Sequence, residues 1–371
     1  MGQNVGTPRI YVDWGSWLKS IGQFELLQHG GISNRPDLLY PRIGLNVSVQ
    51  QFPTTDADSW HTINMTSGAF GDLNNFPNYC AVLGHNFATV GNRFSIESFN
   101  GSEATGMGEV EIINVGSNGH SVNYDGFSIM EFSNPTHHEY IRPFFAGWDG
   151  TNMIPHTQDL KIGSICYGRY YDFSHSPDLN LTMTIENDGI TTQQTKGGAT
   201  LTNARYSGAP KWGDLGAWEL QSYSAEGNPT SWSRNSQLGA RTGRRSWNLT
   251  FSYLSDKQTL PVNALGGSLG DSDSLNDSNG YTEGEDWYSG GAAGDIFGTQ
   301  GNILSVLNGE DFFSSVWSKT MGGHLPFIFQ QDRNNSNPDQ FAICRFDMDS
   351  LQVKQVAFNT YTISLKIREC W

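Results

Sequence analysis

The chain is long, acidic and poor in charged residues, and these properties narrow the classes of protein to which it can belong. Of its 371 residues, 16% are charged, 12% are aromatic and 43 are glycine, a composition typical of many strands joined by tight turns rather than of a disordered chain. The 22 basic and 37 acidic residues leave a net charge of −15, which argues against binding to nucleic acid or to an anionic membrane surface. No apolar run approaches the about 20 residues that a membrane-spanning helix needs, so no membrane insertion is expected.

The N-terminal residues 1–35 are predicted to form an arm. Apolar residues alternate from residue 10 to residue 14 and then recur at helical spacing before Gly22, which indicates a short strand followed by a short helix. Aromatic side chains so near a terminus must be shielded from water by another part of the protein or by a neighbouring molecule. We therefore expect them in an assembly interface or, as an equal alternative, in a strap over the first domain of the same chain. These residues are Ile10, Tyr11, Trp14, Trp17 and Leu18.

A β-sandwich is predicted for residues 36–175. Apolar and polar residues alternate cleanly over 43–49, and Gly- and Asn-rich breaks separate most of the strands that follow. No long helix lies between them, which favours a sandwich or barrel over a parallel doubly wound sheet. The further predicted strands are Tyr79–Leu83, Arg93–Phe99, Glu109–Asn114, Gly126–Phe132, Tyr140–Phe145 and Asp159–Tyr167.

A second β-sandwich is predicted for residues 176–371, with the boundary near Ser174–Asp178. Alternating strands are expected over Leu179–Ile185, Trp247–Tyr253 and Tyr361–Ile367, a long Gly-rich exposed loop over 266–301, and helices around 303–307 and 311–320. The predicted fold class is therefore all-β. It comprises two jelly-roll-like β-sandwich domains, the N-terminal arm and one or two short helices.

Motifs for catalysis or metal binding are not found. The acidic residues of 271–286 do not match the ligand spacing of a calcium loop, and His137 and His138 would point to opposite faces of a strand. Ser268 lies in a G-x-S-x-G string, but an acidic Gly-rich loop follows where a nucleophile elbow needs a helix. We therefore expect no enzyme activity, no metal and no cofactor.

Four aromatic residues are candidates for stacking on sugar rings. Aromatic faces complement the C–H face of a sugar ring, whereas core or interface packing is the alternative for the same residues. The candidate glycan contacts are Trp148, Tyr167, Tyr170 and Tyr171.

Three groups of segments resemble structural proteins of tailed-bacteriophage virions, especially minor tail and tail-tip proteins. They are Pro8–Trp14; Tyr79–Phe87 with Lys161–Gly168; and Gly243–Phe251 with Tyr361–Glu369. The middle pair is similar to strands of a galactose-binding-like jelly roll, and the half from residue 178 onward is similar to β-sandwich modules of distal tail proteins. No ligand-site signature accompanies the resemblance, so sugar binding is not implied by it.

The resemblance implies a non-enzymatic building block of the phage tail, near the tip or baseplate. Its partners would be copies of itself in a closed ring and other tail proteins. The N-terminus lacks the features of a secretory signal and the four cysteines form no CxxC pair, which fits synthesis in the host bacterial cytoplasm before incorporation into the virion. Two alternatives remain: a host-adhesion module that binds surface glycan, and a capsid decoration protein.

Overall fold

The structure is a computed structural model, and the strands and short helices named below lie within the residues that it describes. The predicted strand over 43–49, the pair His137–His138, Ser268, the helix around 303–307 and the loop over 266–301 lie outside the described residues. The described residues are 6–22, 26–30, 50–52, 59–64, 77–83, 85–99, 110–112, 120–121, 127–132, 140–148, 153–154, 160–186, 190–204, 244–260, 310–336 and 340–370.

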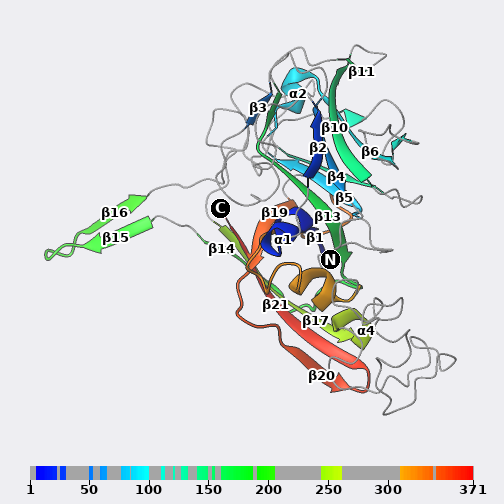
Figure 1. Ribbon diagram of the computed structural model, residues 1–371. Coiled ribbons are helices and arrows are strands. Elements are labelled where there is room, and N and C mark those ends of the chain that lie inside the picture. Colours follow the sequence, from blue (N-terminus) through cyan, green and yellow to red (C-terminus); the bar gives the residue numbers. More distant parts are fainter. Residues whose placement is uncertain are drawn as a thin grey trace.

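A ten-stranded antiparallel sheet forms the centre of the molecule, and the predicted all-β class is confirmed (Figure 1). One of the ten strands, β20 (Val353–Ala357), pairs with β21 outside the main strand order. The other strands lie in the order β14 (Thr182–Glu186), β17 (Arg244–Leu254), β21 (Thr360–Glu369), β19 (Phe341–Phe346), β18 (Phe327–Gln330), β1 (Arg9–Asp13), β13 (Ser164–Asp172), β5 (Tyr79–Leu83) and β9 (Phe127–Glu131).

Strand β1 occupies an interior position in this sheet. Tyr11 lies opposite Tyr170 of β13 on one side and opposite Ile328 of β18 on the other. The first and the last thirds of the chain are therefore joined through the N-terminal strand, and residues 9–13 are not a peripheral arm. The predicted boundary near residue 176 falls between β13 and β14, which belong to the same sheet, so the strand pairing does not divide the chain there.

A seven-stranded sheet lies at the end of the molecule opposite to β17 and β20 (Figure 1). Two further strand pairs complete the described β-structure: β12 (Leu160–Ile162) with β3 (Gln50–Phe52), and the hairpin of β15 (Ile190–Gln194) and β16 (Thr200–Ala204). The strands of the seven-stranded sheet are β2 (Leu26–Gly30), β4 (Ser59–Asn64), β10 (Tyr140–Trp148), β6 (Arg93–Phe99) and β7 (Val110–Ile112), with β11 (Met153–Ile154) on β10 and β8 (His120–Ser121) on β6.

The two larger sheets share one apolar core. Phe94 of β6 and Phe145 of β10 stack with their ring centroids 5.3 Å apart, and they belong to the same buried cluster as Val82 of β5 and Ile165 of β13. A smaller cluster around Tyr11 covers the other face of the central strands. Because both faces are covered there, all residues of β5 are buried.

Short helical segments connect several strands. They are α1 (Trp14–Ser20), α2 (Phe87–Val90), α4 (Asp256–Thr259) and η3 (Phe313–Trp317). The last confirms the predicted helical segment within 311–320, although its hydrogen-bond spacing is that of a π-helix. Val316 of η3 is fully buried, so η3 packs against the core through its apolar side.

Candidate functional site

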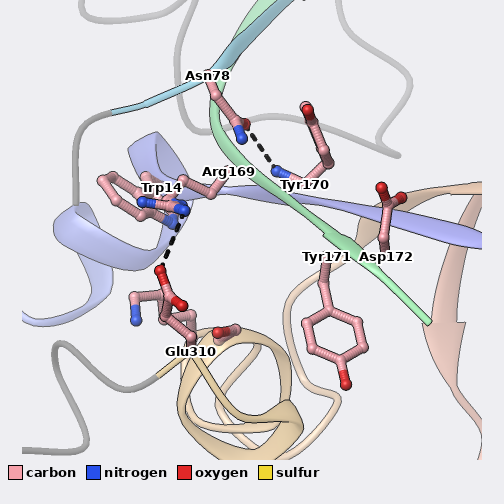
Figure 2. A pocket seen from close by; sticks show the side chains of 9 residues that line it. Trp14, Asn78, Arg169, Tyr170, Tyr171, Asp172 and Glu310 are labelled. Atoms are coloured by element: carbon pink, nitrogen blue, oxygen red, sulfur yellow. Dashed lines mark hydrogen bonds and ion pairs between the residues drawn. The ribbon is translucent and has the colours of Figure 1, made fainter. Parts of the chain in front are cut away.

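A pocket of about 300 Å³ lies where α1, β13 and the segment around η3 meet (Figure 2). Its lining mixes aromatic, hydroxyl, amide and charged groups, a combination typical of sites for small polar ligands. The lining residues are Trp14, Asn78, Arg169, Tyr170, Tyr171, Asp172, Glu310, Ser315 and Lys319.

Strand β13 sends its side chains alternately to the two faces of the sheet. Tyr171 packs in the larger core cluster, whereas Tyr170 packs with the smaller cluster on the other face. Figure 2 shows Tyr171 directed toward the helical segment, and Tyr170 and Asp172 directed to the opposite side. Arg169 shares the strand face of Tyr171, so these two side chains, rather than the two neighbouring tyrosines, lie on the same side of the pocket.

Trp14 is placed at the pocket by the junction between β1 and α1. The Asp13 carboxylate caps the helix by accepting hydrogen bonds from the backbone N–H groups of Gly15 (3.1 Å) and Ser16 (3.2 Å). Asp13 is buried, and the loss of solvation raises its pKa to about 7. The pairing of β1 with β13 places Trp14 against Gly168. A Cβ atom at Gly168 would lie 2.9 Å from the Trp14 Cδ1 atom.

Arg169 and Glu310 form an ion pair across the mouth of the pocket. Their nearest atoms, Nη2 and Oε1, are 3.6 Å apart, and the Glu310 side chain is 80% exposed. An exposed pair at this distance is weak because water screens it.

Lys319 is a second cation at the pocket, and it is buried. Its Nζ donates a hydrogen bond to the Ser314 carbonyl oxygen at 3.0 Å. The ammonium also lies 5.8 Å from the Trp14 ring centroid and 5.4 Å from that of Trp17, within the range of cation–π attraction.

Burial dominates the titration of this lysine. It lowers the pKa of Lys319 to about 8; the nearby Arg169 acts in the same direction, and Asp311 opposes it. Lys319 is thus a buried cation near one negative charge, Asp311, and one positive charge, Arg169.

Asp172 belongs to an ion cluster on the far side of β13. The Arg9 guanidinium donates to both of its carboxylate oxygens, at 2.5 and 2.9 Å, and Arg333 lies 3.5 Å away. This bidentate pair links β1 to the end of β13. Asp172 therefore helps to hold the two strands together.

The four predicted glycan-contact residues do not form one surface. Tyr167 is buried in the core, and Trp148 is the last residue of β10 in the other sheet. Tyr170 and Tyr171 both line the pocket but extend to opposite faces of β13. The Tyr171 hydroxyl donates to the carbonyl oxygen of Gln258 at 3.2 Å. Of the four, Tyr171 is the one that shares a strand face with Arg169 in the pocket.

The predicted assembly-interface residues are buried within the chain itself. None of these side chains is more than 4% exposed, and they belong to the two core clusters of the central sheet. They are covered within the chain, as in the alternative expected for the N-terminal segment, although by an interior strand (β1) and the helix α1 rather than by a strap. We therefore do not carry an interface role forward for Ile10, Tyr11, Trp14, Trp17 and Leu18.

Arg169, Glu310 and Lys319 were not anticipated from the sequence. Arg169 is far from the other two along the chain, and the pairing of β1 with both β13 and β18 brings the segments together. Local patterns do not reveal such long-range pairing. The one local signal was the cluster of tyrosines next to Arg169.

Comparison with protein-family models, curated proteins and solved structures found no match. Within the described ranges, no helix is long and apolar enough to cross a membrane. The same ranges contain no group of three or more His, Cys, Asp or Glu residues arranged to hold a metal ion.

Proposed function

We propose that the chain is a structural subunit of a tailed-bacteriophage virion, located at the tail tip or baseplate. It assembles there as a symmetric homo-oligomer and docks neighbouring tail proteins. The resemblance of its segments to tail proteins suggests this role. The observation that supports it best is the β15–β16 hairpin, which extends away from the sheets (Figure 1).

The hairpin has the properties of an assembly arm. Residues 191–203 are exposed, and its strands pair with each other from Ile190↔Ala204 to Gln194↔Thr200. An isolated two-stranded hairpin is only marginally stable in water, and each outer edge presents unpaired backbone groups. Addition of a strand from a neighbouring molecule would satisfy these groups.

Strand β14 offers an edge for such an addition. It ends the central sheet, and among the described strands it pairs with β17 alone. Three apolar side chains on or beside it are exposed: Leu179 by 92%, Met183 by 47% and Ile185 by 56%. An edge strand with exposed apolar residues favours association. Repeated arm-to-edge contact between copies closes a ring when the rotation between neighbours divides a full turn.

Electron microscopy of the purified chain tests this proposal. We expect closed rings in negative stain, and antibody against the chain should label the tail tip of the phage particle. Label on the head instead would replace the tail role by that of a capsid decoration protein. Absence of the chain from the particle would contradict both roles.

A second candidate is a host-adhesion module that binds a surface glycan. The pocket between α1, β13 and η3 favours it, because aromatic and hydrogen-bonding groups meet there. Saturable binding in a broad glycan panel would support this candidate, and a flat result would exclude it.

A further inference from the structure

We propose that the second strand of the hairpin, β16, adds to β14 of a neighbouring copy in antiparallel register, with Leu201 opposite Ile185. The pairing rests on the proposed function and deepens it by naming the strand, its direction and the side chains that meet. Both strands have five residues, so the overlap of Thr200–Ala204 with Thr182–Glu186 pairs every residue of both.

The two sides of β14 differ in polarity. Met183 lies opposite the buried Trp247 of β17, so Met183 and Ile185 share the core side of the sheet. Both side chains are about half exposed, and the apolar side of the sheet therefore reaches solvent at this edge. The residues that point to the opposite side are all polar: Thr182, Thr184 and Glu186.

Strand β16 has a matching alternation. Leu201 is 59% exposed and is the one large apolar side chain of this strand. Antiparallel overlap places Leu201 opposite Ile185 on the apolar side of the edge, and Thr202 opposite Thr184 on the polar side. A shift by one residue would turn Leu201 to the polar side, so the alternation selects this phase of the pairing.

Strand β15 fits the same edge less well. Its antiparallel overlap with β14 would set Gln193 opposite Met183 and Thr191 opposite Ile185, so only polar side chains would meet the apolar side. The overlap of β16 sets Asn203 opposite Met183 and the leucine opposite Ile185. Among the described strands β16 pairs with β15 alone, and its other edge is the one that meets β14.

The charges of the two strands also favour contact between copies. Lys196 in the turn is the one charged residue of 190–204, and Glu186 is the one charged residue of β14. Glu186 already forms an ion pair with Arg368 of its own chain. In a chain with a net charge of −15, two nearly uncharged strands can meet with little repulsion between copies.

The pairing is one between copies. Ala204, the last residue of β16, pairs with Ile190, which lies beyond Glu186 along the chain. Because the hairpin extends away from the sheets, β16 ends before it reaches the level of its own β14 (Figure 1). A second copy of the chain is therefore the occupant of the β14 edge, and repetition of the contact runs head to tail.

Disulfide cross-linking of the full chain tests the register. Leu201→Cys and Ile185→Cys are combined in one chain, and mild oxidation should link copies into a ladder on a non-reducing gel, because directly opposite Cβ atoms lie about 4.5–5.5 Å apart. The control combines Leu201→Cys with Thr184→Cys, whose side chains point to opposite sides in this register and should not link. The native cysteines are free and mostly buried, so the parent chain should give no ladder.

Gel filtration of the parent chain separates the pairing from the proposed function. An oligomeric parent whose Ile185→Cys combination fails to link, or whose Thr184→Cys combination links equally well, overturns the pairing and leaves assembly through the arm in place. A monomeric parent overturns both.

A single substitution tests the contact of Leu201 without cross-linking. Leu201→Thr keeps a strand-forming residue but removes the apolar contact, and the dissociation constant of the oligomer should rise at least about tenfold. The matched control is Gln193→Thr, opposite Leu201 on β15, which does not meet β14 and should assemble as the parent does. An unchanged dissociation constant for Leu201→Thr would also overturn the pairing.

Discussion

Gly168 lies where β13 passes closest to β1, directly opposite Asp13. A Cβ atom at this position would come within 2.2 Å of the Val12 carbonyl oxygen, which is backbone of an interior strand and has little room to shift. We expect Gly168→Ala to lower the free energy of unfolding by about 1–3 kcal/mol or more. Chemical denaturation measures the loss. The matched control is Gly197→Ala, where a Cβ would meet nothing within 4 Å and the change should stay within about 0.5 kcal/mol.

Asp13 should make the stability depend on pH in an unusual direction. Its pKa in the folded chain is about 7, above the ordinary value of 3.8, because burial disfavours the carboxylate. Between these values the folded state binds more protons than the unfolded state, so this group's contribution to stability falls as pH rises from about 4 to about 7. The ionisable groups that face Asp13 are Tyr79 and Cys80 on β5 and Cys166 and Tyr167 on β13.

Asp13→Asn removes this titration while keeping an oxygen that can cap α1. We expect the stability of the variant relative to the parent to be more favourable at pH 8 than at pH 5, as measured by urea denaturation at both values. The control is Asp349→Asn at an exposed position. A difference between parent and Asp13→Asn that is the same at both pH values would show that Asp13 does not carry the shift.

Strand β14 is the element on which assembly depends in the proposed function. Met183→Lys places a charge on its exposed apolar side, and edge lysines oppose strand addition. We expect loss of oligomers in gel filtration with a change in stability within about 0.5 kcal/mol, because the side chain is already half exposed. Val356→Lys on β20 is the matched control and should assemble normally. Equal assembly by both variants would remove β14 from the interface.

Several elements were predictable from the sequence because their signal is local. The bounds predicted for β5 and β6 agree with those found, since an apolar run or a period-two pattern between turn residues identifies a strand. The partners of β1 were not predictable, because Ile10 pairs with Phe329, far along the chain. The tyrosines next to Arg169 form a local cluster and could be identified from the sequence. Lys319 reaches the pocket only through distant strand pairing and could not.

At the scale of the whole molecule, the central sheet makes the two halves of the chain interdependent. Strand β1 pairs with β18, and Phe173 stacks on Phe251 with ring centroids 4.1 Å apart. A fragment ending at residue 175 would lose both contacts and expose apolar faces of β1 and β13. We expect it to show no cooperative unfolding transition in denaturant. A fragment with a sharp transition and protected amides would instead support an independent first domain.

In the proposed function, copies of this chain assemble through the β15–β16 arm. Light scattering coupled to gel filtration gives the mass of the intact chain and of a chain with residues 190–204 replaced by a short Gly-Ser linker, at matched concentrations. We predict a closed oligomer of defined mass for the intact chain and a folded monomer for the chain without the arm. A monomer in both cases, or the same oligomer in both, would contradict the claim.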